Sequence, residues 1–577
     1  MKKLLLGNAA VAAGAYEAGV KVVSSYPGTP STEITENMVK YENVYCEWAP
    51  NEKVAAETAI GASIAGGRAM SCCKHVGLNV MADPVFTVAY TGVNAGLVFC
   101  VADDPGMHSS QNEQDSRHYA KASKIMMLEP SDSSECKEYT KRAFSLSEQF
   151  DTPVFIRLST RVSHSQSLVN LQEPDKVDLK EYEKNPAKYV MMPANAIKRH
   201  TVVEERIKKL RDFAETTDLN RVEMNSGEIG VITSGITYMY AKEALGDKAS
   251  YLKIGMPYPL PEKLIKDFAE KVKKLYVIEE LDPVLEEHCK ALGLEVIGKD
   301  AFTLLGEYSV NMIKKAVLGI GEPETAHPEN VPVRPPVMCA GCPHRGTFYV
   351  LKKLGLTVSG DIGCYTLGAA APLAAMDTTI CMGASVSAAH GMAKARGAEF
   401  NRHLVSVIGD STFIHSGITG LIDIVYNKGA NTVIILDNSI TGMTGHQDNP
   451  TTGKTIRGEA TKQVDLMLLC KAVGVDSVRI ADPFDVKNFE KTVKEEIEKD
   501  EPSVIIAQRP CALLKKVKYT GHCVITDKCR NCKQCLKAGC PAISVKDGKP
   551  VIEPTQCNGC TLCTNICPFD AIVKEER

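Results

Sequence analysis

Short apolar runs alternate with segments of helical periodicity along most of the chain, a pattern typical of parallel α/β sheets. Residues 84–102, PVFTVAYTGVNAGLVFCVA, carry no charge and are long enough to cross a bilayer. Pro84, Gly92 and Gly96 interrupt this run. A helix that leads into a buried parallel strand, GLVFCVADDPG, explains the run better, so we expect no membrane span here.

The first residues, MKKLLLGNAAVAAGA, imitate a secretory signal, because a basic pair precedes an apolar stretch and then small residues. Asn8 interrupts the apolar stretch, and Glu17 follows inside what reads as one continuous helix. That helix leads to a predicted strand, VKVVSSYP. We therefore interpret the segment as part of the fold and expect a soluble, cytoplasmic protein.

Residues 403–445 have the pattern of a strand–helix–strand unit. LVSVIGD reads as a buried strand that ends at Gly409 and Asp410, and NTVIILDN reads as a second strand that ends at Asn438. Open α/β sheets bind ligands at the carboxyl ends of such strands. An acid and an amide there can hold a hard divalent cation that also binds phosphate. An ordinary unit with capping residues is the alternative.

Composition limits the possible architectures and partners. A chain of 577 residues is too long for one hydrophobic core, so we expect three to five domains. The net charge of −3 gives no reason to expect nucleic acid or an anionic membrane as a partner. Two charged segments that contain proline, 171–196 and 321–336, are predicted linkers, and a helix is expected over 198–217.

Eight of the 21 cysteines lie between residues 529 and 567. The motif from Cys557 to Cys567 has the bacterial ferredoxin spacing C-x2-C-x2-C-x3-C-P, and the motif from Cys529 to Cys540 is one residue longer before its last cysteine. Zinc knuckles are the alternative, but they are usually closed by four local ligands. The Cys-Pro ends and the repeated PAISV and FDAIV strands favour ferredoxin.

The segment 520–577 therefore resembles a ferredoxin with two clusters, in which the last cysteine of each motif binds the other cluster. One [4Fe-4S] cluster is expected at Cys529, Cys532, Cys535 and Cys567. The other is expected at Cys557, Cys560, Cys563 and Cys540.

The strand–helix–strand unit resembles the thiamine diphosphate signature, with Ser411 where a second glycine is usual. The resemblance implies that Gly409, Asp410 and Ser411 bind the cofactor. It also implies Mg²⁺ bound by Asp410, the Asn438 side chain and the backbone carbonyl of Ile440.

Such enzymes also need a carboxylate beside the aminopyrimidine, which helps to remove the proton from the thiazolium C2. Glu52, nine residues before the GAS segment at 61–63, fits this pattern. Glu57 is the rival, and it reads equally as a residue on a solvated helix face.

These parts together resemble the 2-oxoacid:ferredoxin oxidoreductases, and most closely the large subunits of the indolepyruvate branch, nearly from end to end. YPGTPSTE, NEKVA, KHVGLNV and ADDPG are similar to the pyrimidine-binding domain. CAGCPHRGTFY, GDIGCYTLG, MGASVSAAHGMAKA and LDNSITGMTGHQDNP are similar to the diphosphate-binding domain, and 228–318 to the transketolase C-terminal domain.

The implied fold class is α/β, with two doubly wound thiamine-binding domains, a transketolase C-terminal-like α/β domain and a dicluster ferredoxin domain. The expected ranges are 1–190 for the pyrimidine domain, 191–325 for the transketolase-like domain, 335–515 for the diphosphate domain and 520–577 for the ferredoxin domain.

The resemblance places further residues near the substrate or cofactor. Thr29 would lie near the substrate carboxylate or keto oxygen, although it also reads as a helix N-cap beside a proline. Lys74 and His75 would lie in the pocket, although a solvated lysine and a satisfied histidine explain them nearly as well. Met382 would contact the cofactor. His344 and His415 are weaker candidates.

Related pyruvate enzymes hold a third, proximal [4Fe-4S] cluster beside the thiamine, and four positions here match its ligands: Cys339, Cys342, Cys364 and Cys511. A thiol pair without iron, or a zinc site, are the alternatives. The remaining nine cysteines read as small hydrophobic residues; they are Cys46, Cys72, Cys73, Cys100, Cys136, Cys289, Cys381, Cys470 and Cys523.

The resemblance implies ferredoxin-dependent oxidative decarboxylation of arylpyruvates such as indolepyruvate, with coenzyme A, to arylacetyl-CoA. It implies thiamine diphosphate, Mg²⁺ and three clusters as cofactors. It implies a small β subunit in an α₂β₂ assembly and an external ferredoxin as partners. The alternatives are the same chemistry on branched-chain or other 2-oxo acids, or an electron-transfer subunit whose thiamine site is inactive.

Overall fold

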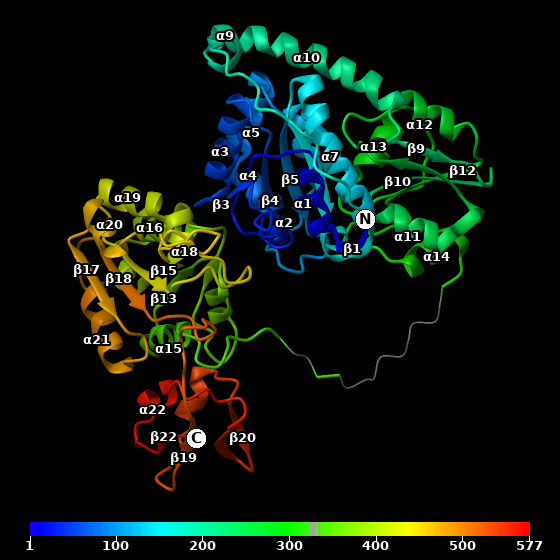
Figure 1. Cartoon of the computed structure of the whole chain (residues 1–577). Helices are drawn as coiled ribbons and strands as arrows, with labels where there is room; N and C mark the ends of the chain where they lie inside the picture. The colour runs from blue at the N-terminus through cyan, green and yellow to red at the C-terminus, as the bar shows by residue number, and fades with distance from the viewer. Residues whose placement is uncertain (322–330, 333–334, 577) are drawn as a thin grey trace. The chain divides into compact units, whose positions relative to one another are not determined.

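The computed structural model describes residues 1–321, 331–332 and 335–576, and the chain divides into two compact units, Met1–Ala326 and His327–Arg577 (Figure 1). Most of the predicted linker 321–336 lies outside the described residues. Within the described ranges, no helix is both long and apolar enough to cross a membrane.

The first unit begins with a six-stranded parallel sheet in the order β3-β2-β4-β5-β7-β6. Its central strands are buried along their whole length, as expected for a parallel sheet covered on both faces. The strands are β2 (Val22–Ser25), β3 (Tyr45–Trp48), β4 (Ala69–Lys74), β5 (Leu97–Asp103), β6 (Met126–Leu128) and β7 (Val154–Ser159).

Eight helices accompany this sheet: α1 (Gly7–Glu17), α2 (Thr32–Met38), α3 (Glu52–Ile64), α4 (His75–Val80), α5 (Ala82–Thr91), α6 (Arg117–Ser123), α7 (Ser133–Phe150) and α8 (Thr160–His164). The expectation of one continuous helix from the N-terminus is wrong for the first residues. Lys2–Leu6 forms strand β1, because antiparallel pairing with β8 (Gln166–Asn170) satisfies its backbone groups.

A smaller sheet follows in the same unit, in the order β12-β10-β11-β9, with only β9 antiparallel. The helix expected over 198–217 begins earlier, at Pro193, and contacts both α5 and α12 (Figure 1). The elements are α9 (Pro186–Tyr189), α10 (Pro193–Thr216), β9 (Arg221–Glu223), β10 (Ile229–Ser234), α11 (Gly235–Leu245), β11 (Ser250–Ile254), α12 (Glu262–Ala269), β12 (Lys274–Ile278), α13 (Val284–Ala291) and α14 (Val310–Leu318).

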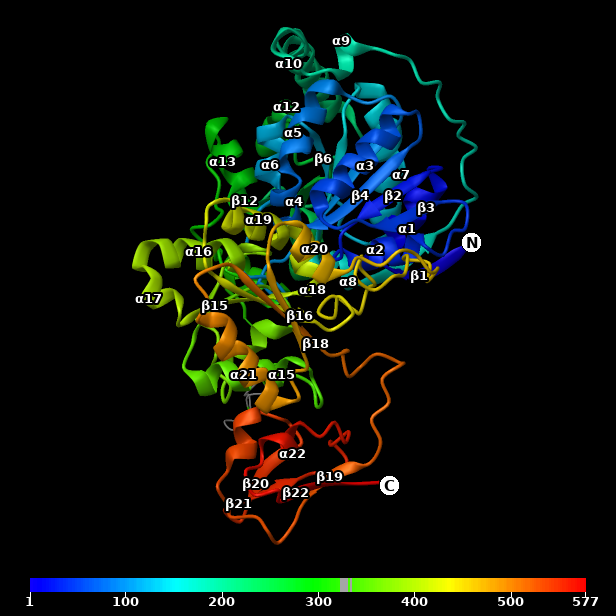
Figure 2. The ribbon, with the colours of Figure 1, turned by 90° about the vertical axis from the view of Figure 1, so that its left-hand side faces the viewer.

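The second unit contains another six-stranded parallel sheet, in the order β14-β13-β15-β16-β18-β17. Helices α15 and α21 pack on one face of this sheet, and α16, α19 and α20 pack on the other (Figure 2). The strands are β13 (Thr357–Gly360), β14 (Thr378–Thr379), β15 (Leu404–Gly409), β16 (Thr432–Asp437), β17 (Ser477–Ala481) and β18 (Ser503–Gln508).

The helices of this sheet are α15 (His344–Leu354), α16 (Ala384–Arg396), α17 (Ala398–Asn401), α18 (Asp410–Thr412), α19 (Ile418–Tyr426), α20 (Leu466–Ala472) and α21 (Val486–Ile497). The predicted strand–helix–strand unit is present. A π-helical turn at Phe413–Gly417 lies between its first strand and α19. The α/β prediction is confirmed by both six-stranded sheets.

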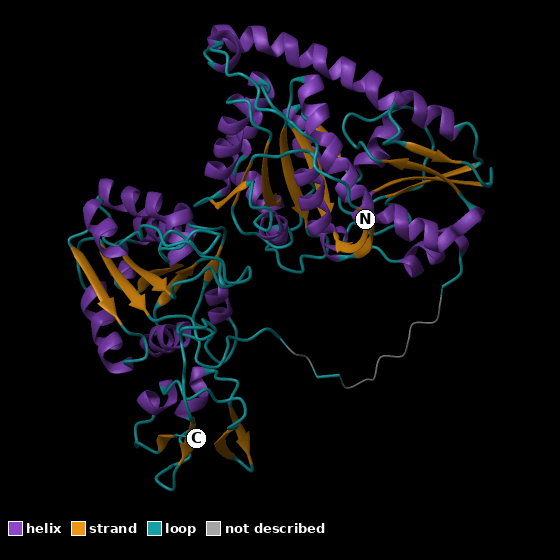
Figure 3. Cartoon of the chain, in the orientation of Figure 1, coloured by secondary structure: helices purple, strands orange, loops and turns teal. Residues whose placement is uncertain are grey.

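The C-terminal segment has two short antiparallel ribbons and two short helical turns (Figure 3). Strand β19 pairs with the final strand β22, which contains only the last two residues of FDAIV, while β20 contains the last three residues of PAISV. The elements are β19 (His522–Ile525), β20 (Ile543–Lys546), β21 (Lys549–Ile552), α22 (Leu562–Ile566) and β22 (Ile572–Glu575).

The two sheets of the first unit are joined by a buried ion network. Arg117 and Asp115, from the connection after β5, form an ion pair at 2.5 Å, and Arg117 also pairs with Glu279, which follows β12. All three side chains are at most 2% exposed. Because water is excluded, removal of one partner leaves the others buried without compensation.

We expect Arg117→Leu to destabilise the protein by about 3–5 kcal/mol, the cost of breaking a buried ion pair. Arg142→Leu is the matched control, since the Arg142–Asp218 pair is exposed and is worth at most about 1 kcal/mol. Urea unfolding followed by circular dichroism measures both. Equal effects of the two substitutions would contradict a structural role for the buried network.

Candidate functional site

Glu52 lies at the edge of the first sheet where the strands end. It is the first residue of α3, whose N-cap Asn51 accepts a 2.9 Å hydrogen bond from the Val54 amide. The Glu52 side chain is buried, and a Cβ atom added at Gly77 would stand 2.6 Å from its Oε1. Glu57, by contrast, is 47% exposed and pairs with Lys53. Of the two rival carboxylates, only Glu52 is enclosed by the fold.

Thr29, Lys74 and His75 are connected by one loop, residues 104–116, which joins β5 to α6. Lys74 Nζ donates to the Ser109 carbonyl at 2.8 Å, and Ser109 Oγ donates to the Thr29 carbonyl at 3.2 Å. His75 Nε2 lies 3.1 Å from the Asn112 carbonyl. Sequence reasoning missed Ser109 and Asn112; their position in a polar loop after a buried strand was the available signal.

The N-cap interpretation of Thr29 is not supported, because Ser31 occupies the N-cap position of α2. The Lys74 side chain packs against Gly28, where an added Cβ atom would lie 3.3 Å from Lys74 Cγ. The structure therefore brings Thr29 and Lys74 together at the ends of the adjacent strands β2 and β4.

Burial controls the charges at this edge. It lowers the pKa of Lys74 to about 8, against the opposing influence of Asp104 and Glu52. Burial also lowers the pKa of His75, although Asp103 opposes the shift. At neutral pH the site therefore presents one ammonium group beside a neutral imidazole.

In the second unit, Asp410 and Asn438 follow β15 and β16, which are neighbours in the sheet. Both side chains are buried, and the Asn438 Oδ1 accepts a 3.3 Å hydrogen bond from the Ile440 amide. Burial, with Asp437 close by, raises the pKa of Asp410 to about 7. A buried carboxyl group with a second carboxylate beside it is a setting that a divalent cation would stabilise.

The loop after Ile440 returns over this edge. Thr451 Oγ1 donates to Asp410 Oδ2 at 3.0 Å, and Thr441 Oγ1 donates to Ser411 Oγ at the same distance. Sequence reasoning did not single out Thr441 or Thr451, because a threonine in a polar loop carries no distinctive pattern.

Gly409 and Met382 belong to the same edge. A Cβ atom at Gly409 would stand 2.7 Å from Tyr365 Cε1, so the tyrosine ring lies directly against this glycine. The Met382 carbonyl accepts a 3.1 Å hydrogen bond from Ser416 Oγ. Asp361, another residue missed from sequence, follows β13 and accepts 2.9 Å hydrogen bonds from the amides of Gly383 and Ser385. These bonds fix the start of α16 at the edge.

Three of the four cysteines expected to hold a proximal cluster lie near one another: Cys339, Cys364 and Cys511. Cys511 also adjoins Asn438. The Cys511 amide donates to the Asn438 carbonyl at 2.9 Å, and an added Cβ atom at Gly442 would lie 3.4 Å from Cys364 Sγ. Burial raises the pKa of Cys364, and the neighbouring Cys511 and Cys339 thiols raise it further. Burial raises the pKa of Cys342 to about 12.

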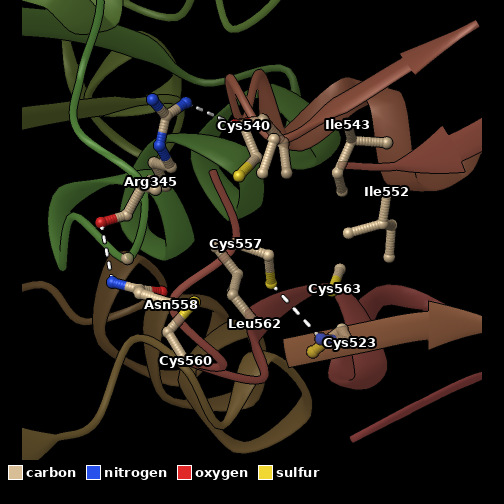
Figure 4. A pocket seen from close by; sticks show the side chains of 14 residues that line it. Arg345, Cys523, Cys540, Ile543, Ile552, Cys557, Asn558, Cys560, Leu562 and Cys563 are labelled. Atoms are coloured by element: carbon tan, nitrogen blue, oxygen red, sulfur yellow. Dashed lines mark hydrogen bonds between the residues drawn. The ribbon is translucent and has the colours of Figure 1, made fainter. Parts of the chain in front are cut away.

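The eight tail cysteines separate into two cavities. The first has an empty volume of about 320 Å³, and its lining includes Cys529, Cys532, Cys535 and Cys567. The second, of about 420 Å³, is shown in Figure 4, and its lining includes Cys540, Cys557, Cys560 and Cys563. Each cavity thus gathers three cysteines from one motif and the last cysteine of the other.

Cys523 also lines the second cavity, and its amide donates to Cys557 Sγ at 3.3 Å (Figure 4). It is buried, as expected of a small hydrophobic residue, but its position beside four other thiols was not predicted. Within the described ranges, no three His, Cys, Asp or Glu side chains converge on a point that could hold a single metal ion. A [4Fe-4S] cubane does not need side chains that converge on one point, because each iron atom binds a separate thiolate.

Three family models match the chain. The model of the thiamine diphosphate-binding domain of pyruvate flavodoxin/ferredoxin oxidoreductase matches residues 13–225. The model of the C-terminal TPP-binding domain of thiamine pyrophosphate enzymes matches residues 361–507, and the 4Fe-4S binding domain matches residues 550–573. The chain therefore contains thiamine diphosphate-binding domains and a 4Fe-4S domain.

The chain is 41% identical to the indolepyruvate oxidoreductase subunit IorA of Archaeoglobus fulgidus, with 99% of this chain and 97% of that protein covered. Identity to the subunit of the same name from Thermococcus kodakarensis is 40%, over 98% and 96% of the two chains. The 2-oxoglutarate synthase subunit KorA of Methanothermobacter marburgensis is 27% identical over 47% of this chain and 86% of its own length.

Among solved structures, a 2-oxoglutarate:ferredoxin oxidoreductase from Magnetococcus marinus aligns with a TM-score of 0.47 and 20% identity, over 55% of this chain and 65% of that one.

The sequence predicts that Glu52 lies beside the aminopyrimidine of thiamine diphosphate. On that prediction, we expect Gly77→Ala to weaken binding of the cofactor, because the new methyl group would displace the Glu52 carboxylate and crowd Cys73 Cβ at 3.0 Å. The accompanying loss of stability should be about 1–3 kcal/mol, the usual cost of overpacking. Gly61→Ala is the matched control, since it lies in the helix that carries Glu52 and nothing stands within 4 Å of an added Cβ atom. Calorimetric titration with the cofactor measures the affinity. Wild-type affinity in Gly77→Ala would show that Glu52 does not contact the cofactor.

Proposed function

Because the chain belongs to the family of indolepyruvate oxidoreductase IorA subunits, we propose that it catalyses the ferredoxin-dependent oxidation of arylpyruvates, with indolepyruvate as the preferred substrate. The family makes the protein an oxidoreductase. The proposed substrate rests on how far the sequence similarity extends. About 40% identity spans nearly the whole chain for the indolepyruvate subunits, whereas the similarity to the 2-oxoglutarate subunit covers less than half of it.

The proposed reaction consumes indolepyruvate, coenzyme A and two oxidised ferredoxins. The bond between the carboxylate and the keto carbon breaks, carbon dioxide leaves, and a thioester bond to coenzyme A forms. The products are indoleacetyl-CoA, carbon dioxide, one proton and two reduced ferredoxins. The two electrons released from the substrate are those gained by the ferredoxins.

The residues described above fit the cofactors that this reaction requires. We propose that Asp410, the Asn438 side chain and the Ile440 carbonyl hold Mg²⁺, because Asp410 is a buried carboxyl group whose pKa is raised by burial and by Asp437. Gly409, Ser411 and Met382 line the same edge and would contact the cofactor. When bound, thiamine diphosphate supplies a nucleophilic carbon and accepts the electron pair released with carbon dioxide, and iron–sulfur clusters carry single electrons.

Glu52 is proposed as the carboxylate that exchanges a proton with the aminopyrimidine. Its burial and its place against α4 support this role over Glu57, which is exposed and paired. Lys74 is proposed to hold the substrate carboxylate through its ammonium group. Thr29 and His75 are proposed to orient the keto group, since the 104–116 loop links both to the same edge.

Three [4Fe-4S] clusters are proposed. Two would occupy the tail cavities, each lined by four of the eight tail cysteines. The third would be held by Cys339, Cys342, Cys364 and Cys511. Burial raises the pKa of the last three, and the Cys339 thiol adds to each of these shifts. The Cys511 amide joins this set to Asn438.

The relatives are named as subunits, which supports a second chain as partner. We propose a small β subunit in an α₂β₂ assembly and an external ferredoxin as the electron acceptor. The absence of disulfides among the described cysteines is compatible with the cytoplasm, where thiols stay reduced.

The proposal predicts that the complex, purified anaerobically, reduces a ferredoxin surrogate faster with indolepyruvate or phenylpyruvate than with 2-oxoisovalerate or pyruvate. Glu52→Gln should lower the rate at least about 100-fold, as expected for loss of a group that moves a proton. Glu57→Gln is the matched control and should leave the rate near wild type, because its side chain is exposed. Faster reduction with 2-oxoisovalerate would move the protein to branched-chain substrates. An absence of turnover with all four acids would favour an electron-transfer subunit.

The pKa of Lys74 predicts a pH dependence. Because burial lowers this pKa to about 8, Lys74 is charged below that pH and loses its charge above it. The kcat/KM for the anionic 2-oxo acid should therefore fall as the pH rises through about 8. Lys74→Arg, which stays charged throughout, should abolish this fall even if its rate is lower. A wild-type profile that stays flat to pH 10, or an unchanged fall in Lys74→Arg, would exclude Lys74 as the carboxylate-binding group.

A further inference from the structure

Arg345 is a buried arginine that connects two cysteine-bearing loops of the second unit. Its Nε donates to the Cys339 carbonyl at 3.0 Å, and its Nη2 donates to the Met338 carbonyl. Its Nη1 donates to the Ala538 carbonyl at 3.0 Å and to the Gly539 carbonyl. One guanidinium group thus binds the loop of the proposed proximal cluster and the residues just before Cys540 (Figure 4).

The hydrogen-bond partners of Arg345 in the described part of the chain are all backbone carbonyls. The side chain is 2% exposed, and the ion pairs found among the described residues do not include it. Burial lowers the pKa of Arg345, and the ionisable groups that oppose this shift are Cys540, Cys342, Cys339 and Cys560. A buried cation that lacks a carboxylate partner is costly unless another negative charge is close. Cysteine-bound iron–sulfur clusters on both sides would supply that charge.

A second contact joins the 338–342 loop to the other tail motif. Asn558 Nδ2 donates to the Ala340 carbonyl at 3.0 Å (Figure 4). Gly341 has φ +75°, and an added Cβ atom there would stand 2.4 Å from Asn558 Nδ2. The segment Cys339–Cys342 and the segment Cys557–Cys560 therefore face each other, and the Asn558 side chain fills the place that a side chain at residue 341 would need. Ala340, Gly341 and Arg345 also form part of the wall of the second tail cavity.

Resting on the cluster sites of the proposed function, we propose that Arg345 is a positioning residue for electron transfer. It holds the 338–342 loop against the 538–540 loop, and its charge raises the reduction potentials of the two clusters between which it lies. The reduction potentials should rise because each cluster becomes more negative when it is reduced. A fixed cation in a water-excluded site stabilises the added electron.

An arginine suits this position better than a lysine. The planar guanidinium group presents five N–H donors in a fixed arrangement and keeps its charge when buried, so it can bind four carbonyls from two loops at once. A lysine would keep a charge but could not reproduce that set of bonds. Charge and geometry can therefore be separated by substitution.

The baseline for the test is the cluster content of the wild-type complex, measured by anaerobic iron and sulfide analysis. Cys339→Ala should lose about one third of the iron if three clusters are present, and the EPR signal that disappears identifies the proximal cluster. Wild-type protein with iron for only two clusters would refute the proximal site of the proposed function, whatever Arg345 does.

The test of Arg345 is an EPR-monitored redox titration of the holoenzyme, combined with freeze-quench measurement of electron arrival at the tail clusters. With cluster content unchanged, Arg345→Gln should lower the potentials of the proximal cluster and of the adjacent tail cluster, and should slow transfer between them. Arg345→Lys should leave the potentials closer to wild type but still slow the transfer. Lys353→Gln is the matched control, because it removes an exposed charge from the same helix and should change neither potential.

Wild-type potentials and transfer rates in Arg345→Gln, with full iron content, would overturn the inference. Loss of iron from both Arg345→Gln and Arg345→Lys would also overturn it, since the residue would then act only in holding the fold. Each of these results leaves the thiamine and substrate assignments of the proposed function intact.

Discussion

Parallel pairing places the carboxyl ends of neighbouring strands at the same edge of a sheet, and the chemistry proposed for this chain depends on that constraint. In the second unit the order β13-β15-β16-β18 sets side by side four segments that are far apart in sequence. The residues that follow these strands are Asp361, Asp410, Asn438 and Cys511. The first unit repeats the arrangement, because Thr29, Glu52 and Lys74 lie at or just after the ends of β2, β3 and β4.

Buried charge distinguishes positions that the chain itself neutralises from positions proposed to adjoin a cofactor. Arg117 is enclosed, but carboxylates of the chain itself neutralise it. Asp410 has another carboxylate as its neighbour, and Arg345 has only backbone carbonyls as hydrogen-bond partners among the residues described. Such groups are costly in a protein made of amino acids alone, because desolvation penalises the ionised form. The proposed cation beside Asp410 and the proposed anionic cluster beside Arg345 would offset this cost.

The fold could be predicted from sequence to a useful depth because its signals are local. Apolar runs predict that strands end at Asp410 and Asn438. The spacing of the tail cysteines predicts which of them gather in each cavity. The choice between Glu52 and Glu57 could not be made from the pattern, because burial depends on how α3 packs against α4. The contacts of Ser109, Thr451 and Arg345 depend on where loops return in three dimensions. For the same reason the first strand, β1, was mistaken for helix, since its partner β8 lies more than 150 residues away in sequence.

The carbonyl set around Arg345 bears on how the protein is assembled in the cell. Without bound clusters, packing of the 338–342 loop against the 538–540 loop encloses the Arg345 cation, which is then stabilised only by peptide carbonyl dipoles. With both proposed clusters bound, the same packing places that cation between two anionic centres. The proposal therefore links cluster insertion thermodynamically to docking of the tail, and a chain without its clusters should keep its ferredoxin segment accessible to the machinery that delivers iron and sulfide.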